Sequence, residues 1–240
     1  SVRYNAHLNT GRVQTPTLAM IVKRDADIAN FIKQKYFTVD LDMGFKAASA
    51  RIDDENAAER LVSSCNGKTA TVTDVKKEIK SVSAPKLFDL TSLQREANKK
   101  FGYTAQQTLD YMQSLYEKKL VTYPRTDSQY LSDDMEQTTY ALIPAISEHF
   151  GFGSVAEPNL RAVINNRKVT GHHAIIPTES GVKCDISALA VGEHNILKLV
   201  ALRLLCASAS AYQYGAVKVT LSCENTEFTA SGKTVLESGW

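Results

Sequence analysis

The chain has 240 residues, 43% of them hydrophobic and 22% charged, which is typical of a folded protein of one or two domains. The formal net charge is only +2, so a nucleic-acid partner would have to be recognised by local charge. Four scattered cysteines without a C-x-x-C pair argue against a zinc framework and favour a reducing, cytoplasmic compartment. The most apolar run, residues 195–212, contains two basic residues and is too short to span a bilayer.

The first third of the chain is predicted to form helices and strands. Apolar residues at helical spacing, with Thr15 as a cap and Pro16 at the first helical position, predict a helix over residues 15–32. Strict alternation over residues 36–47 predicts one half-buried strand. A short helix over 53–64 and a strand over 69–82 are expected to follow.

From Pro85 the pattern becomes helical. Two capping boxes, Thr91 with Gln94 and Thr104 with Gln107, predict the starts of two helices, and Gly102 ends the first.

A third helix is expected to begin at Ser132, where acidic residues follow and the helix dipole favours them. A loop-rich stretch over 151–192, a long helix over 193–211 and a β-hairpin over 216–237 complete the chain.

This order predicts an α+β fold, because strands and helices are segregated along the chain. Residues 34–84 and 213–240 are expected to form a β-rich domain, into which a helical domain of residues 85–212 is inserted. The chain starts without a methionine and stops abruptly, so we expect it to be a fragment of a longer protein.

The segment "KKLVTYPRTDSQYLSDD", residues 118–134, places a tyrosine where a helix ends. Pro124 favours an extended conformation at Tyr123, so Tyr123 and Arg125 should project to the same side. One interpretation is a half-buried tyrosine with an arginine that forms a surface pair. The other is a nucleophile, since a guanidinium can hold a phosphodiester with two donors while a phenol attacks it.

Two more segments bear on this choice. "TGHHAIIPTES" places His172 and His173 in a turn-rich stretch, where paired histidines are more often solvated or structural than catalytic. "NTGRVQTPTLAM" places Arg12 and Gln14 just before a helix N-terminus, which is itself an anion site. Each signal alone is weak, because caps and basic residues are common.

Together the segments are specific. "GRVQTPTLAMIVKRDADI", "LFDLTSLQREANKKFGYTAQQTLDYMQSLYEKKLVTYPRTDS" and "HHAIIPT" resemble three signature segments of the type IA DNA topoisomerases, in the order of that family. They are most similar to its topoisomerase III branch, and the resemblance covers essentially the whole chain. One departure is Asn9, where the family usually carries a serine.

The resemblance implies a toroidal parent enzyme in which a β-rich arch carries a helical domain with the nucleophile. It implies that Tyr123 becomes linked to a 5′ phosphate, that Arg125 holds this phosphate and that His172 lies near it. It also implies contacts with single-stranded DNA by Arg12 and Gln14, in a partial groove domain of residues 1–33.

The tyrosine motif itself continues into Asp127 and Ser128, which we expect to contact DNA as well. The resemblance further implies Mg²⁺ in the parent enzyme, bound by a Toprim domain that these residues do not contain. No metal or cofactor is therefore expected in this chain, and the chain alone should be inactive.

The parent is expected to be an ATP-independent isomerase that cleaves one strand, passes another through and reseals it, relaxing negative supercoils or decatenating. DNA, chiefly single-stranded, is the expected partner of a monomer that has no membrane partner. An alternative is a single-strand-binding module without catalysis. A tyrosine recombinase or type IB enzyme is disfavoured, because here the tyrosine precedes the histidine.

Overall fold

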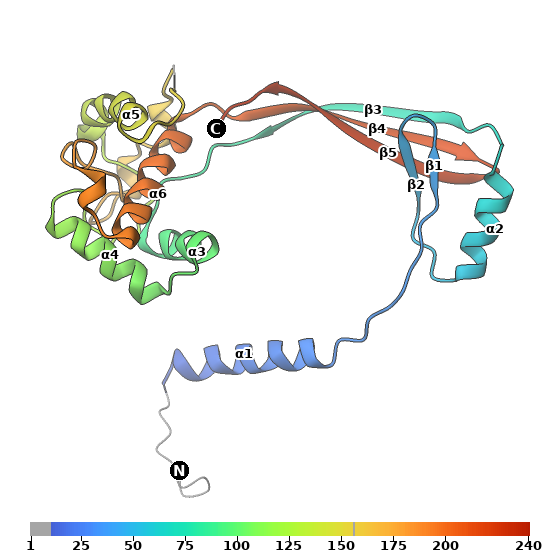
Figure 1. Ribbon diagram of the computed structural model, residues 1–240, viewed down its shortest axis with the longest axis horizontal. Coiled ribbons are helices and arrows are strands. Elements are labelled where there is room, and N and C mark those ends of the chain that lie inside the picture. The colour runs from blue at the N-terminus through green and yellow to red at the C-terminus, as the bar shows by residue number, and fades with distance from the viewer. Residues whose placement is uncertain (1–10, 156) are drawn as a thin grey trace, which may run out of the picture. The chain divides into compact units, whose positions relative to one another are not determined.

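The computed structural model describes residues 11–155 and 157–240 (Figure 1). In this part of the chain it contains six α-helices and a five-stranded antiparallel sheet, so the mixed α+β class is confirmed. Its contacts divide it into a first unit, Ser1–Val75 with Val219–Ala230, and a second unit, Lys76–Lys218 with Ser231–Trp240. The domain limits predicted from the sequence differ from this division and stay a prediction.

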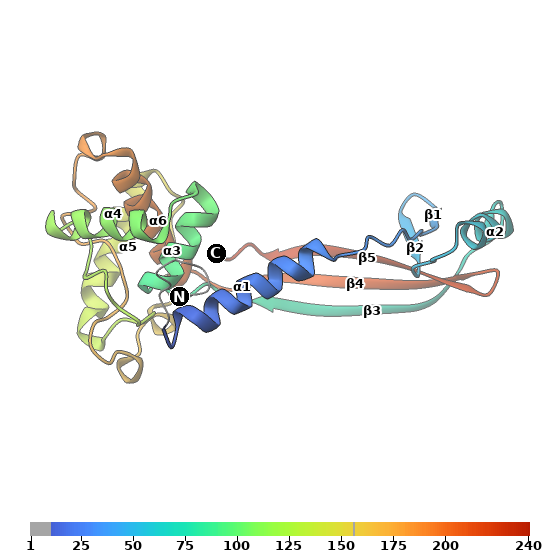
Figure 2. The same cartoon turned by 90° about the horizontal axis from the view of Figure 1, so that it is seen from below.

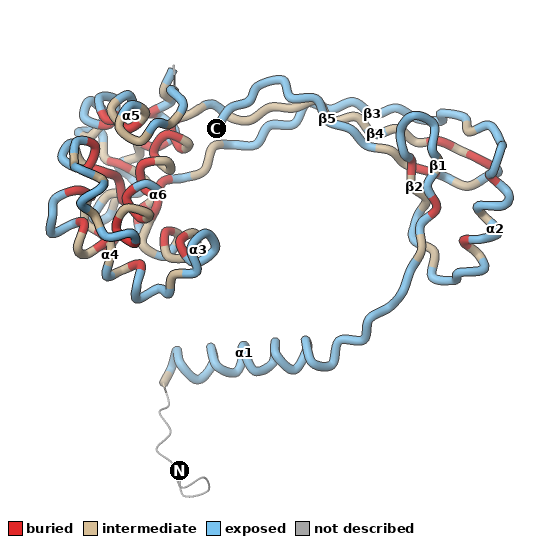
Figure 3. Tube along the Cα trace, in the orientation of Figure 1, coloured by how far each residue is buried: buried red, intermediate tan, exposed pale blue. Residues whose placement is uncertain are grey.

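In the first unit, helix α1 (Gln14–Ala29) has no buried residue (Figure 3). The predicted cap is wrong, since the helix begins after Val13 and Thr15 lies in its first turn. The Thr15 hydroxyl instead accepts a hydrogen bond from the backbone N–H of Gly11 at 3.2 Å. The helix also ends three residues before the predicted limit.

The single strand predicted over residues 36–47 is wrong. The structure has two short strands here, β1 (Asp40–Asp42) and β2 (Lys46–Ser49), paired antiparallel. Gly44 turns the chain between them with φ +83°, a left-handed conformation that suits glycine. Alternation of apolar residues continued across the turn, so the pattern alone could not reveal it.

Helix α2 (Glu55–Cys65) follows as predicted, capped by the Asp54 carboxylate, which accepts from the backbone N–H of Ala57 at 3.0 Å. The sheet order is β1-β2-β5-β4-β3, with β3 (Thr71–Val82), β4 (Tyr212–Cys223) and β5 (Thr226–Glu237) side by side (Figure 2). Glu224 and Asn225 form the β4–β5 turn with φ +47° and +61°, so the predicted hairpin is confirmed.

The second unit contains α3 (Leu90–Phe101), α4 (Ala105–Glu117), α5 (Glu136–Phe150) and α6 (Val191–Ser208). Helix α6 packs against α4 and α5 and is buried along most of its length (Figure 3). Two clusters of buried apolar side chains form the core around it. Such burial is worth about 25 cal/mol per Å² of apolar surface removed from water, so the buried face of α6 stabilises this unit.

The capping predictions for α3 and α4 had different outcomes. The box of Thr104 with Gln107 opens α4 as predicted. Helix α3 is capped by Asp89, whose carboxylate accepts from the backbone N–H of Ser92, so the predicted box of Thr91 with Gln94 is wrong. Gly102 ends α3 with φ +72°, as predicted.

The remaining segments of the second unit are irregular but hydrogen-bonded to one another. They contain three-residue 3₁₀-helices at Asp133–Met135, Leu160–Ala162, Asn166–Lys168 and Ile186–Ala188. Isolated β-bridges join Phe88 to Ile175, Val121 to Pro177 and Leu131 to Ile164. Among the helices of the described residues, none combines the length and the hydropathy of a transmembrane span.

Candidate active site around Tyr123

The end of helix α4 sets the direction of the tyrosine segment. Lys119 has φ +61°, so the chain leaves the helix in a left-handed turn, and the backbone N–H of buried Leu120 donates to the Leu115 carbonyl at 2.9 Å. Val121 then forms a β-bridge with Pro177. Tyr123 follows two residues later in a stretch without helix or strand, after the end of α4.

Thr122, the residue before Tyr123, is held in place by three hydrogen bonds. Its backbone N–H donates to the Ile176 carbonyl at 3.0 Å, and its hydroxyl accepts from the Ile176 N–H at 3.0 Å. The same hydroxyl lies 3.2 Å from the Ala174 carbonyl, to which it donates. The tyrosine segment is therefore held against the segment that carries the histidines.

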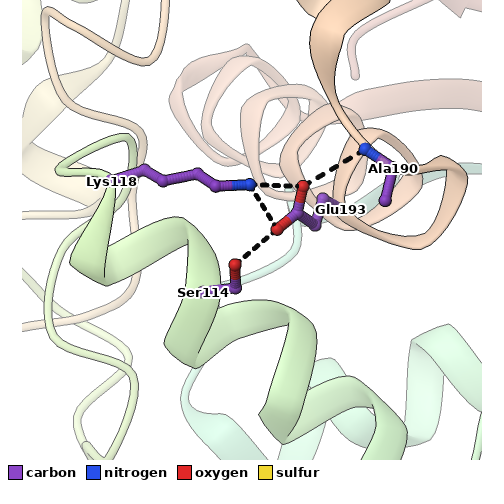
Figure 4. A network of polar contacts seen from close by, with 4 residues as sticks. All are labelled: Ser114, Lys118, Ala190 and Glu193. Atoms are coloured by element: carbon purple, nitrogen blue, oxygen red, sulfur yellow. Dashed lines mark hydrogen bonds and ion pairs between the residues drawn. The ribbon is translucent and has the colours of Figure 1, made fainter.

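An ion pair between Lys118 and the buried Glu193 secures the end of α4 (Figure 4). The Lys118 ammonium donates to both oxygens of Glu193, at 2.6 and 2.7 Å, and Ser114 Oγ donates to the same carboxylate at 2.5 Å. The backbone N–H of Ala190 donates at 3.2 Å, so Glu193 also caps its own helix, α6. Figure 4 shows three groups, Ser114, Lys118 and the backbone of Ala190, converging on the Glu193 carboxylate.

Glu193 is only 5% exposed, so its ionisation has to be stabilised by its neighbours. Burial is the largest single influence and raises its pKa. Hydrogen bonds from Lys118 and Ser114 and from the Ala190 N–H together outweigh burial and hold the pKa below the ordinary value. The carboxylate therefore stays charged at neutral pH and links α4 to α6.

Three rings form a contiguous group at the candidate site. The Tyr123 ring lies 4.3 Å from the His172 ring, centre to centre, with a tilt of 42°. The ring of Tyr116, near the end of α4, lies 5.5 Å from the Tyr123 ring, edge to face. Tyr123 is half-buried and His172 is exposed, so a ligand could reach both.

The histidine is held in place through its backbone. Thr126 Oγ donates to the His172 carbonyl at 2.9 Å, so the tyrosine and histidine segments are joined on both sides of Arg125. The next residue, His173, is half-buried, and its Nδ1 lies 2.8 Å from the Ala174 carbonyl. A carbonyl only accepts, so this nitrogen of His173 donates and the ring faces its own backbone.

Arg125 lies between two buried residues, Pro124 and Thr126, and its own side chain is exposed. Within residues 11–155 and 157–240, no carboxylate lies within 4.0 Å of its guanidinium. An exposed, planar guanidinium two residues after Tyr123 in the chain is suited to bind a phosphate with two donors.

The other predicted DNA contacts are placed differently. Asp127 is exposed, but Ser128 is 4% exposed and its hydroxyl bonds backbone groups of Tyr130 and Lys168. Ser128 therefore supports the loop, and its hydroxyl does not face solvent.

Arg12 and Gln14 are exposed and belong to the first unit, at the start of α1. The predicted departure at Asn9 lies outside the described residues.

Sequence reasoning did not single out Tyr116, Thr126 or Glu193. Tyr116 is seven residues before Tyr123, which is two helical turns, but the change of direction at Lys119 hides their proximity. For the metal, the described residues contain no group of three or more His, Cys, Asp or Glu side chains that could hold an ion. These residues do not fit a Mg²⁺ site, and no chemical step is assigned to a metal here.

Comparison with known proteins shows the family to which this chain belongs. The family described as DNA topoisomerase matches residues 1–240. DNA topoisomerase 3 of Bacillus subtilis and that of Bacillus licheniformis are each 39% identical over 255 residues, covering 100% of this chain and 35% of the relative. The chain thus spans about a third of the length of these relatives.

A solved structure, full-length topoisomerase I of Thermotoga maritima, matches with a TM-score of 0.72 over 96% of this chain and 39% of that one. At 24% identity this match shows the shared fold alone. The match over all 240 residues and the full-length coverage of this chain by its relatives agree. The chain belongs to the type IA DNA topoisomerase family.

Proposed function

We propose that this chain is the part of a type IA DNA topoisomerase that carries the nucleophile, Tyr123. The observation that carries the proposal is the contact of the Tyr123 and His172 rings, 4.3 Å apart, on segments that also present an unpaired Arg125. The parent enzyme cleaves one DNA strand, passes another strand through the break and reseals it. It thereby relaxes negative supercoils or decatenates, without ATP.

In the proposed step the Tyr123 oxygen attacks the phosphorus of a phosphodiester. A bond forms from this oxygen to phosphorus, and the bond from phosphorus to the 3′ oxygen breaks. The phenol loses its proton, the leaving 3′ oxygen gains one, and no electrons are transferred. The phosphotyrosine ester retains the energy of the broken bond, so the 3′ hydroxyl can reverse the reaction without ATP.

Arg125 and His172 have separate roles in this proposal. Arg125 binds two oxygens of the scissile phosphate and keeps its charge at every relevant pH. His172 lies against the nucleophile ring and is exposed, so it can donate a hydrogen bond to the same phosphate. Both groups stabilise the negative charge that builds up on phosphorus oxygens during attack.

The rest of the assignment extends to the parent protein. We assign DNA contacts to Arg12 and Gln14 in the first unit and to Asp127 in the second. The β-rich part corresponds to the arch of a toroidal enzyme, and Mg²⁺ belongs to a part of the parent that these residues do not include. The proposed setting is a cytoplasmic monomer, which is compatible with four free cysteines.

The test uses the longer protein that contains this chain, with Tyr123→Phe as the variant. The wild type should form a DNA-linked band with labelled single-stranded DNA after denaturation, and Tyr123→Phe should form none. Single-strand binding should be almost unchanged, because the variant loses one oxygen and little contact area. Tyr116→Phe is the matched control, since it removes a hydroxyl from the adjacent ring.

An adduct that persists in Tyr123→Phe would show that another residue is the nucleophile. If neither protein forms an adduct but both bind single strands, the chain belongs to a binding module without catalysis.

A further inference from the structure

A second group of functional side chains lies seven residues beyond the nucleophile, around Tyr130. The Lys168 ammonium donates to the Tyr130 hydroxyl at 3.2 Å and lies 4.6 Å from the centre of its ring. The Lys86 ammonium lies 5.6 Å from the same ring centre. Tyr130 is half-buried and both lysines are exposed, so two solvent-accessible cations lie near one phenol.

The three residues are held by separate contacts within the second unit. Arg203 of α6 donates to the Lys86 carbonyl at 3.2 Å. The buried Ser128 hydroxyl accepts from the Tyr130 N–H at 3.1 Å and lies 3.0 Å from the Lys168 carbonyl, to which it donates. The backbone at all three positions is therefore fixed, which is the property that a preorganised binding site requires.

The arrangement concentrates positive charge without a counterion. The separation of the two ammonium groups cannot exceed the sum of their distances to the ring centre, which is close to the Debye length of ~10 Å at 0.1 M salt. In the described part of the chain, no carboxylate lies within 4.0 Å of either ammonium. The phenol ring relieves part of their mutual repulsion through cation–π attraction.

The two neighbouring lysines change the pKa of the Tyr130 phenol. The hydrogen bond from Lys168 is the largest influence on the Tyr130 pKa and lowers it; burial acts in the opposite direction, and the charge of Lys86 lowers it further. Negative charge is thus favoured at this point of the surface.

We infer that Lys86, Tyr130 and Lys168 bind a backbone phosphate of the single strand that reaches Tyr123. The two ammonium groups and the phenol O–H supply donors to phosphate oxygens, and charge-assisted bonds of this kind are the strong ones. The inference rests on the proposed function, which supplies the strand. It adds a binding subsite for a phosphate other than the scissile one, and it assigns Ser128 a positioning role there.

The distance along the chain is compatible with one continuous strand. Seven residues of extended chain reach at most ~25 Å, so the two tyrosines lie within the length of a short oligonucleotide. Contacts of this kind position the strand and carry no base sequence information. Binding should therefore depend on salt and not on which bases are present.

The test measures the affinity of this chain for fluorescein-labelled oligo-dT of about 15 nucleotides by anisotropy, over a series of KCl concentrations. The slope of log K against log salt reports the number of phosphates neutralised, at about 0.7 per phosphate on a single strand. The double variant Lys86→Gln/Lys168→Gln should reduce this slope by about 0.7 and weaken binding at low salt. Tyr130→Phe, which keeps the ring and loses the hydroxyl, should weaken binding less than the double variant does.

The matched control is Lys99→Gln/Lys183→Gln, which changes the net charge equally at two exposed lysines. It should leave the slope unchanged. A slope in the Lys86/Lys168 variant equal to that of the control, or an intact chain that fails to bind oligo-dT at the lowest salt, would overturn the inference. Circular dichroism of each variant establishes that the slopes are compared between folded proteins.

The adduct assay on the longer protein separates this inference from the proposed function. If the Tyr123 adduct forms and the slope is unaffected by Lys86→Gln/Lys168→Gln, the subsite assignment alone fails. If the slope falls as expected and no adduct forms, the subsite stands and the catalytic proposal fails.

Discussion

Removing the cation that pairs with the buried Glu193 at the end of α4 gives the sharpest test of how the tyrosine segment is supported. Lys118→Met keeps the methylene stem and removes only the ammonium, which lies 2.6 and 2.7 Å from the two Glu193 oxygens. The carboxylate then remains buried with two donors, Ser114 and the Ala190 N–H. Because these two donors cannot replace a full positive charge, we expect a clear loss of stability.

The magnitude follows from the exposure of the two partners. Breaking a fully buried pair from one side costs ~3–5 kcal/mol, because the other charge is left without compensation. Here the Glu193 side chain is 7% exposed but that of Lys118 is 46% exposed, so solvent already screens part of the interaction. We therefore expect ~2–3 kcal/mol at neutral pH. The exposed pair of Lys100 with Glu96, at 3.8 Å, is the control, and Lys100→Met should cost less than ~1 kcal/mol.

The pH dependence of the stability loss in Lys118→Met tests whether the loss comes from the charge of Glu193. The folded-state pKa of Glu193 is below the ordinary value of 4.5, so the pair stabilises the fold above that pH and ceases to as the pH falls through the lowered pKa. In Lys118→Met, burial is no longer offset by the cation, so the pKa rises and the folded protein takes up a proton. The stability difference between wild type and variant should thus be large at neutral pH and smaller at an acid pH below the lowered pKa of wild-type Glu193.

Urea unfolding followed by circular dichroism at both pH values measures this difference. An equal difference at the two pH values would show that Lys118 acts through packing and not through the buried charge of Glu193.

Three further outcomes are expected. In the longer protein, Arg125→Lys keeps the charge but loses the planar pair of donors, so strand cleavage should slow by roughly 10²-fold in a quenched time course; an unchanged rate would contradict the phosphate-binding role. Gly181→Ala places a Cβ 2.1 Å from the Leu120 carbonyl oxygen, three residues before Tyr123, so the melting midpoint should fall by an amount equivalent to ~1–3 kcal/mol, and an unchanged midpoint would show that this backbone shifts freely. This chain alone should neither cleave nor relax DNA, because general acid help worth ~10²–10⁴ in rate has no assigned residue here; a DNA-linked band on a denaturing gel, absent in Tyr123→Phe, would contradict this.

Local sequence signals determined the elements whose physics is local. The box of Thr104 with Gln107 satisfies its own helix end, and the αL residue after α3 is a glycine, so both could be read from short windows. Short sequence segments gave the wrong cap for α3, where two residues that can cap a helix lie close together in the sequence. Asp89 caps α3 in place of Thr91, with its second oxygen accepting from the side chain of Gln129, a residue far along the chain.

Local sequence signals predicted only part of the candidate site. The sequence predicted that Tyr123 is extended and past a helix end, because Pro124 restricts the residue before it. A family resemblance, and not spacing, suggested a role for His172. The sequence could not show that the two rings lie 4.3 Å apart.

Tertiary structure decided what depends on contacts between distant segments. Bonds from Thr122 and Thr126 hold the tyrosine segment against residues 172–176, and Glu193 of α6 fixes the helix from which it starts. Burial also gave Ser128 a role that the sequence did not predict, since its hydroxyl bonds backbone groups of Tyr130 and Lys168, and its contact with DNA stays a prediction. The physical reason is that the hydrogen bonds of helix caps and turns form within a few residues. Burial of side chains and pairing between segments depend instead on residues that are distant in the sequence and meet only in the folded protein.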